Sequence, residues 1–372
     1  MGQYAVLKIK DGAVVSQYVE DANLLDQRIQ AKVTPPYPLT RKLQIKSWKF
    51  RDSNFSPDFP TNIEKAEYFY RLAGGHEKFD GAIAINAEVL NHVLEITGPI
   101  TPQGYSTEFR SEDAALVLEE VVEKAYLGDN VPAESKQARK NIMKQLAKDI
   151  LDRLASINNI SKFAELGLRE LREKNVMLHF NDAELEALVQ SVHWDGSVNQ
   201  DWSKDYLMLV DANMGALKTD YHVKRALDYT VDFTGDKPLA TAVYTYQNNA
   251  PYGDWRTSDY HTYLRAFVPK GSVFLERFMI NSVLTNEDLG HTYFGGFVDV
   301  EIGQKDVTTT LKYELPDTIK ADDYELLLQK QSGVGTIPVK VHLITKDGKI
   351  DQEAELKSEL HFTLKPKEEA GK

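Results

Sequence analysis

The sequence predicts an α/β domain over residues 1–233, built as a mixed sheet flanked by helices, and then an antiparallel β-sandwich over residues 234–365. Two observations predict the first domain. Apolar residues recur there at helical spacing, and short apolar runs bounded by glycine and charge, such as Phe79–Asn86, are typical of buried strands in parallel or mixed sheets. A third observation predicts the sandwich: after about Lys224 the helical spacing stops and strand-like alternation with closely spaced turn residues replaces it.

The N-terminal elements are expected to begin with a hairpin. Tyr4–Ile9 and Ala13–Tyr18 alternate like strands, and Asp11–Gly12 between them is a strong signal for a two-residue turn. Two helices are expected next, over Asp21–Ala31 and over Thr61–Leu72, the second with its apolar residues spaced along one face.

Four further helices are expected after the apolar run. The first covers Ala87–Ile96 and is stopped by Gly98–Pro99, and the second follows Ser111, which can cap it. The clearest helix of the chain covers Ser135–Ile157. Asn181 and Glu184 have the spacing of a capping box, which predicts that the last helix starts there.

The C-terminal half is expected to contain strands and turns. Tyr206–Val210 has the pattern of a buried strand, and Asp211, Asn213 and Lys218 fall in a polar, glycine-bearing segment that predicts a turn. The tail 366–372 is charged and is expected to be disordered. The later strands are predicted at 225–233, 239–247, 262–268, 293–302, 307–315, 324–331, 337–344 and 360–364.

Composition excludes several classes of function. The 372-residue chain has a net charge of −12, which argues against nucleic acid as a partner because phosphate binding needs a basic face. The chain has no cysteine, so disulfides, thiol catalysis and cysteine metal sites are excluded. No pair of histidines has the four-residue helical spacing of a zinc enzyme, and no apolar run is long enough to span a membrane.

The strongest candidate for a site is the polar loop that carries Arg51, Asp52 and Asp58. Arginine clamps phosphate oxygens and carboxylates hold magnesium, so these residue types fit an anion site with Asp52 and Asp58 as Mg²⁺ ligands. The alternative is structural, because one of the aspartates can cap the following helix while Arg51 pairs with a carboxylate.

Arg139 lies on a basic stripe of the long helix, together with Lys136, Lys140, Lys144 and Lys148. This stripe is the local exception to the acidic balance of the chain. It suits either a pyrophosphate-binding edge or a solvated helix face.

Several pieces of the sequence, in order along nearly the whole chain, resemble a bacterial family known as the domain of unknown function 4012. Members of that family are usually envelope proteins with a transmembrane segment ahead of the domain. The resemblance therefore implies an extracellular or cell-envelope location, with an anchor that this chain does not contain. The pieces are Tyr4–Leu7 with Asp11–Gly12, Ser56–Pro60, Phe79–Ile85, Thr97–Ile100, Val210–Asn213 with Leu217–Lys218, Tyr263–Arg265 with Val268–Ser272, and Gln329–Gly333.

The family is in turn distantly similar to the LytR-CpsA-Psr phosphotransferases, which attach glycopolymers to peptidoglycan. In those enzymes an Arg-Asp pair, and an arginine followed by glutamine on a later helix, hold a polyprenyl pyrophosphate and magnesium. Arg51–Asp52 resembles the first feature, and Arg139 with Gln145 resembles the second at a different spacing. The resemblance thus implies Arg51, Asp52 and Arg139 as catalytic residues. The opening strand of the DUF4012 family, with its arginine, is missing before Gly2, so the resemblance also implies either that a phosphate site here is incomplete or that the sequence was trimmed ahead of Gly2.

Two hypotheses of different kinds follow from these residues and this resemblance. The first is a magnesium-dependent phosphotransferase that handles a polyprenyl-linked glycan or a cell-wall polymer. The alternative is a cell-surface binding or scaffold protein without turnover, which the missing opening strand and the large sandwich favour. A cytosolic sugar-binding module is a third reading, and it requires that no membrane segment belongs to the protein.

Overall fold

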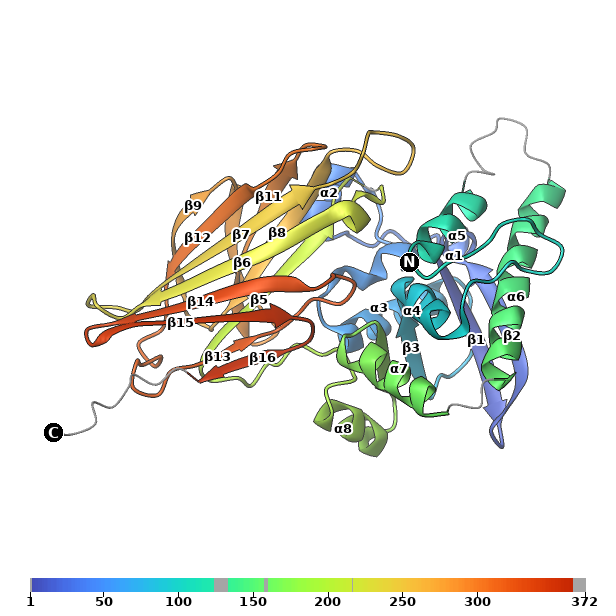
Figure 1. The fold of residues 1–372 in the computed structure, drawn as a ribbon, viewed down its shortest axis with the longest axis horizontal. Coiled ribbons are helices and arrows are strands. Elements are labelled where there is room, and N and C mark those ends of the chain that lie inside the picture. The colour runs from blue at the N-terminus through green and yellow to red at the C-terminus, as the bar shows by residue number, and fades with distance from the viewer. Residues whose placement is uncertain (1, 124–132, 157–159, 216, 364–372) are drawn as a thin grey trace. The chain divides into compact units, whose positions relative to one another are not determined.

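The computed structural model describes residues 2–123, 133–156, 160–215 and 217–363 (Figure 1). The chain divides into two compact units, one formed by Met1–Asp80 with Gly196–Lys372 and the other by Gly81–Asp195. The sequence suggested one boundary near Phe233 instead. The difference arises because two strands that precede this residue pair within the large sheets, and strand pairing cannot be read from alternation alone. The predicted tail 366–372 lies outside the described residues.

The larger unit begins with the predicted hairpin, β1 (Gln3–Lys10) and β2 (Ala13–Asp21), which pair antiparallel. Asp21 then caps α1 (Ala22–Arg28), because its side chain accepts a hydrogen bond from the Asn23 backbone N–H. Leu25, Phe50 and Phe69 are buried in one apolar cluster that joins this helix to the elements after it. Those elements are α2 (Tyr37–Leu43), the 3₁₀ helix η1 (Phe50–Phe55) and α3 (Phe59–Leu72).

Two six-stranded sheets form the rest of the larger unit. Their orders are β10-β11-β8-β5-β13-β16 and β15-β14-β6-β7-β12-β9. A short 3₁₀ helix, η3 (Thr219–His222), precedes β6. The strands are β5 (Asp205–Asn213), β6 (Val223–Asp232), β7 (Leu239–Asn248), β8 (Tyr260–Val268), β9 (Val273–Phe278), β10 (Asn281–Asp288), β11 (His291–Val300), β12 (Val307–Glu314), β13 (Glu325–Leu328), β14 (Ile337–Thr345), β15 (Gly348–Leu356) and β16 (Leu360–Thr363).

Both sheets contribute to one buried cluster, which is the arrangement of a sandwich (Figure 1). Residues alternate between this core and the opposite face, as β7 shows with every second residue buried. The prediction of a purely antiparallel sandwich was wrong, because β13 pairs parallel with β5 and β14 pairs parallel with β6. The sequence pattern indicated the strands correctly, but it carries no information on the direction of a neighbour.

The smaller unit combines helices with one pair of strands. Its hydrophobic cluster joins α4, α5 and α6 through residues such as Leu94, Ala114 and Leu146. The elements are β3 (Gly81–Ile85), α4 (Glu88–Thr97), α5 (Ala114–Glu123), α6 (Ala133–Ser156), α7 (Ile160–Arg172), β4 (Val176–Phe180) and α8 (Ala183–Ser191).

Two predictions for the smaller unit need correction. The run Phe79–Asn86 was expected to be a buried strand of a mixed sheet. Within the described ranges, however, β3 pairs with β4 alone, in antiparallel direction, and Ile83 and Ile85 are 65% and 66% exposed. A continuous apolar run does not reveal how many neighbours a strand will have. The predicted cap at Asn181 is also wrong, because Asp182 accepts from the backbone N–H groups of Glu184 and Leu185 and so caps α8.

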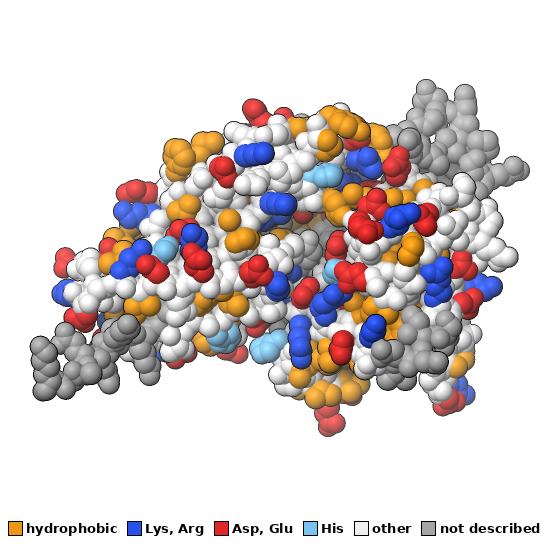
Figure 2. All heavy atoms as spheres, in the orientation of Figure 1, with side chains coloured by type: hydrophobic (Ala, Val, Ile, Leu, Met, Phe, Trp, Pro, Cys, Tyr) orange, Lys and Arg blue, Asp and Glu red, His pale blue; other side chains and the backbone are white. Residues whose placement is uncertain are grey.

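Charges of both signs are mixed over the face shown in Figure 2. On β14 and β15, for example, Lys340 lies 3.3 Å from Glu353 and Lys349 lies 3.0 Å from Asp351. Such exposed pairs contribute little to stability but keep the surface hydrated. Within the described ranges no helix is both long and apolar enough to cross a bilayer.

Candidate functional site

The loop predicted as a site folds into η1, and its two neighbours fix it in place. The Trp48 indole Nε1–H donates to the Asp52 carbonyl at 2.8 Å, which closes the turn from inside. The Lys49 Nζ donates to the Asp26 carbonyl on α1 at 2.8 Å. The start of η1 is therefore held against α1, and the side chains of Arg51 and Asp52 lie next to the last turn of that helix.

Arg51 lies between two carboxylates, and we call Asp26, Arg51 and Asp52 the acid–arginine cluster. The Arg51 Nε lies 3.5 Å from Asp52 Oδ2 and 3.8 Å from Asp26 Oδ2, and its Nη1 donates to Asn23 Oδ1 at 3.2 Å. The Arg51 side chain is 51% exposed, whereas that of Asp26 is only 8% exposed. Arg51 and its sequence neighbour Asp52 thus form an ion pair, and Asp26 adds a buried carboxylate that the sequence did not indicate.

Asp26 is the unusual member of the cluster. Neither of its carboxylate oxygens has a hydrogen-bond partner in the described part of the chain, although the residue is only 6% exposed. Burial raises the pKa of Asp26, while the nearby backbone N–H groups of Phe50 and Arg51, and the Arg51 charge, oppose the rise without cancelling it. A buried oxygen pair without donors is costly, so such atoms often mark the place of a ligand or ion.

Asp58 has the structural role that the sequence offered as the alternative. Its Oδ2 accepts from the Thr61 backbone N–H at 3.0 Å and from the Thr61 hydroxyl at 2.6 Å, which caps α3. Its Oδ1 accepts from the Val198 N–H at 2.9 Å, and the residue is 3% exposed. Both oxygens are therefore occupied, and this carboxylate also ties α3 to the segment that leads into β5.

Arg139 falls within α6, in the stretch 133–140 whose side chains lie outside the described part of the structure. Gln145 farther along the helix donates from Nε2 to Asp149 Oδ1 at 2.8 Å. Catalytic participation of Arg139 stays a prediction. The same holds for Mg²⁺ coordination by Asp58, which would have to displace the helix cap.

The two carboxylates near Arg51, of Asp26 and Asp52, are enough to hold magnesium only if a phosphate ligand supplies further oxygen atoms. Among the described residues no group of three or more histidine or acidic side chains is arranged to hold a metal ion. Mg²⁺, however, is commonly held by one or two carboxylates together with substrate phosphates and water. The orphaned oxygens of Asp26, next to Asp52, supply two such carboxylates, and Arg51 supplies a bidentate donor for phosphate oxygens.

All three residues of the acid–arginine cluster lie in the part of the chain that matches a family model. Residues 1–125 match the family model described as protein of unknown function, DUF4012. The match supports the resemblance to this family for the pieces up to Thr97–Ile100 and ends before α6, so the pieces from Val210 onward and the similarity to the LytR-CpsA-Psr enzymes stay predictions. No curated protein and no solved structure matches the chain.

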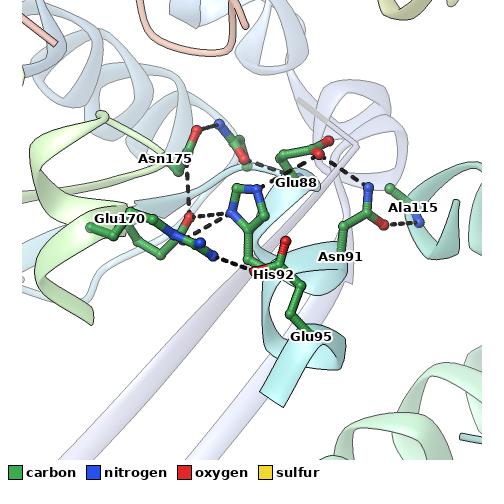
Figure 3. A network of polar contacts seen from close by, with 9 residues as sticks. Glu88, Asn91, His92, Glu95, Ala115, Glu170 and Asn175 are labelled. Atoms are coloured by element: carbon green, nitrogen blue, oxygen red, sulfur yellow. Dashed lines mark hydrogen bonds and ion pairs between the residues drawn. The ribbon is translucent and has the colours of Figure 1, made fainter. Parts of the chain in front are cut away.

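A second polar cluster lies in the smaller unit. Some of its residues lie within the DUF4012 match, which ends at residue 125, and others lie after it. Figure 3 shows His92 of α4 between Glu88 and Glu170, with Asn91 and Asn175 on either side. His92 Nδ1 lies 2.8 Å from Glu170 Oε1, and Asn175 Nδ2 donates to the other Glu170 oxygen at 2.9 Å. Glu170 is 2% exposed, so the pair braces α4 against α7 from within. The sequence gave no signal for it, because 78 residues separate its two partners.

In the larger unit the sequence pattern assigned Asp211 to the wrong element and gave no indication of Asp26. Asp211 was expected in a turn, but it lies within β5 and is buried, where it accepts from Arg225 Nε at 2.7 Å. Asn213 does make the predicted turn, since its Oδ1 accepts from the Gly215 N–H at 2.8 Å. Asp26 was missed because an acidic residue within a short helix usually faces solvent.

Proposed function

We propose that the chain is the exported part of a bacterial cell-envelope protein that binds a polyprenyl-pyrophosphate-linked glycan at the acid–arginine cluster without turning it over. The observation that carries the proposal is Asp26, a buried carboxylate whose oxygens make no well-formed hydrogen bond to the described residues although the Phe50 and Arg51 N–H groups are near, and which lies 3.8 Å from an arginine whose side chain is half exposed. The envelope location and the kind of glycan rest on the family resemblance, as does the proposal that the N-terminal residues share the LytR-CpsA-Psr architecture.

The cluster would recognise a pyrophosphate through opposite charges. Arg51 would donate to non-bridging phosphate oxygens from its exposed side. Asp26 and Asp52 would repel the same oxygens unless a divalent cation lay between them, so binding must depend on Mg²⁺. Magnesium would supply the charge neutralisation, and the protein would supply the fixed positions of two carboxylates and one guanidinium.

Binding without transfer is favoured by the role of Asp58. Phosphoryl transfer depends on groups that position the attacking hydroxyl and neutralise the developing charge, in addition to those that hold the pyrophosphate. Asp58, the third charged residue of the loop, has both oxygens occupied by the α3 cap and by Val198. The second candidate function is the transferase, and the exposed lysines of α6, Lys144 and Lys148, favour it because they add positive charge to the helix whose sequence also contains Arg139.

The two functions are separated by one experiment with geranyl pyrophosphate as a soluble polyprenyl pyrophosphate. Phosphorus NMR with Mg²⁺ is expected to show broadening and shift of both phosphorus signals on addition of protein, and no released phosphate over hours. The Asp26→Asn variant is expected to abolish the change, with Glu67→Gln as a matched control on α3. Absence of any signal change at millimolar ligand would reject the proposal, and consumption of the pyrophosphate would replace it with the transferase.

A further inference from the structure

Arg265 of β8 is a buried arginine that meets no acidic partner in the described part of the chain. Along β8, Leu264 and Ala266 point into the core between the two sheets, while Tyr263 and Arg265 point to the other face, toward the N-terminal segment. Arg265 is 4% exposed, and among the described residues no carboxylate lies within ion-pair distance of it. Burial lowers the pKa of its guanidinium to about 10. Such a residue costs the fold several kcal/mol unless other contacts compensate.

Arg265 contacts the last residue of η1 both through a hydrogen bond and through the face of its guanidinium. Its Nη2 donates to the Phe55 carbonyl at 2.8 Å, and its guanidinium lies 4.3 Å from the centre of the Phe55 ring. The ring of Phe267 lies 5.9 Å away on the same strand, and no described acceptor meets the Arg265 Nε. A planar cation over an aromatic ring, with a hydrogen bond to the same residue, fixes both the position and the tilt of that residue.

Anchoring Phe55 also restricts Arg51 and Asp52. These residues lie four and three positions before Phe55 in the short segment Phe50–Phe55, whose backbone bends at Asn54 (φ −86°, ψ 35°), so an anchored Phe55 limits how far they can move without holding them rigidly. The Trp48 indole holds the other side through the Asp52 carbonyl at 2.8 Å. The loop is thus held at both ends, by an indole from within the N-terminal segment and by a guanidinium from the sandwich.

We infer that Arg265 is a positioning residue for the acid–arginine cluster, by which the sandwich holds η1 in the geometry that binds a pyrophosphate. The expected effect of Arg265 on pyrophosphate binding rests on the proposed function. Its expected effect on the order of η1 does not. It gives the sandwich a part in recognition: the sheet face around Arg265 acts as the platform on which the loop is ordered before the ligand arrives.

A purely structural role for Arg265 is the competing explanation, and the chain offers a matched control. Arg225 is a second buried arginine of the sandwich, 7% exposed, and it contacts Asp211, Asp220 and Tyr260 instead of η1. Arginine-to-lysine substitution at either position keeps the charge but removes the planar group. Only the substitution at Arg265 is expected to act on the loop.

The test measures amide hydrogen exchange over residues 50–56 in the ligand-free protein, followed by titration with inorganic pyrophosphate and Mg²⁺. Arg265→Lys is expected to speed exchange in this segment about tenfold, and to weaken the binding by a similar factor, while exchange along β8 stays unchanged. Arg225→Lys is expected to leave both quantities as in the wild type. Unchanged exchange over residues 50–56 in Arg265→Lys would overturn the inference. If wild-type protein binds no pyrophosphate, the proposed function fails, and the exchange measurement still decides the role of Arg265 in ordering η1.

Discussion

Two clusters of the larger unit each consist of one arginine between two aspartates. They differ in the burial of the arginine and in how closely it approaches the carboxylates. In the sandwich, Arg225 donates from Nε to Asp211 at 2.7 Å and from Nη2 to Asp220 at 2.5 Å, and its side chain is 3% exposed. In the acid–arginine cluster, Arg51 Nε lies 3.5 and 3.8 Å from its two carboxylates and the side chain is 51% exposed.

The aspartates differ even more than the arginines. Asp211 Oδ1 accepts from the Tyr246 and Thr262 hydroxyls, both at 2.9 Å, so every acceptor of that carboxylate is used. Asp26 is buried to a similar degree, yet no described donor meets its oxygens. The comparison teaches that burial of an ion pair does not by itself reveal its role. A saturated cluster stabilises the fold, whereas an unsaturated one keeps capacity for a ligand.

The largest effect is expected from breaking the saturated cluster. Arg225→Met leaves Asp211 and Asp220 without their counter-ion, one of them within the core, and is expected to cost about 3–5 kcal/mol of unfolding free energy. Urea unfolding followed by circular dichroism measures it. A loss below about 1 kcal/mol would show that the hydroxyl donors alone satisfy Asp211.

Asp205 lies on the same strand and face as Asp211, but among the described residues no cation pairs with it, so it makes the comparison sharper. Burial raises its pKa to about 7, and hydrogen bonds from the Tyr324 and Tyr229 hydroxyls limit the rise. The folded protein therefore binds a proton that the unfolded chain releases near its ordinary pKa of 3.8. The contribution of Asp205 to stability is therefore fully present below pH 3.8 and is lost as the pH rises from 3.8 to about 7, by about 2 kcal/mol between pH 5 and pH 7.

The control for this pH dependence is Asp205→Asn, which cannot ionise and keeps an acceptor for both tyrosines. Its urea midpoint is expected to vary less between pH 5 and pH 8 than that of the wild type. An unchanged slope would assign the pH dependence to other groups.

Asp26→Asn is expected to act on binding more than on the fold. The amide removes the burial cost of a charge and keeps the shape, so the free energy of unfolding at pH 8 should stay equal or rise slightly. Removal of one of two magnesium ligands should weaken pyrophosphate binding at least about tenfold, or 1.4 kcal/mol. Loss of stability with intact binding would mean that Asp26 is a structural carboxylate like Asp211.

The smallest effect on stability is expected from Arg51→Ala. Its ion pairs are long and half exposed, so the unfolding free energy should change by less than about 0.5 kcal/mol. A larger loss, measured by the same urea experiment, would place Arg51 with Arg225 among the residues that hold the fold.

Local patterns predicted much of the secondary structure, and long-range pairing accounts for what they missed. The hairpin at Asp11–Gly12, the helix before Gly98 and the strands after residue 224 follow from turn chemistry and periodicity, which act over a few residues. The parallel pairing of β5 with β13 joins segments more than 100 residues apart, and no local signal encodes it. For the same reason the pairing of Arg51 with Asp52 was predictable, whereas Asp26 and Arg265 became visible only in three dimensions.

The central claim, that the acid–arginine cluster binds pyrophosphate together with magnesium, is tested most directly by isothermal titration of inorganic pyrophosphate at low ionic strength. The wild type is expected to bind in the micromolar range with Mg²⁺ and not with EDTA, and Arg51→Ala is expected to bind at least about tenfold more weakly. Arg71→Ala, which removes an arginine of similar exposure from α3, should bind like the wild type. Equal affinities of the wild type and Arg51→Ala, or no binding heat at millimolar pyrophosphate, would contradict the claim.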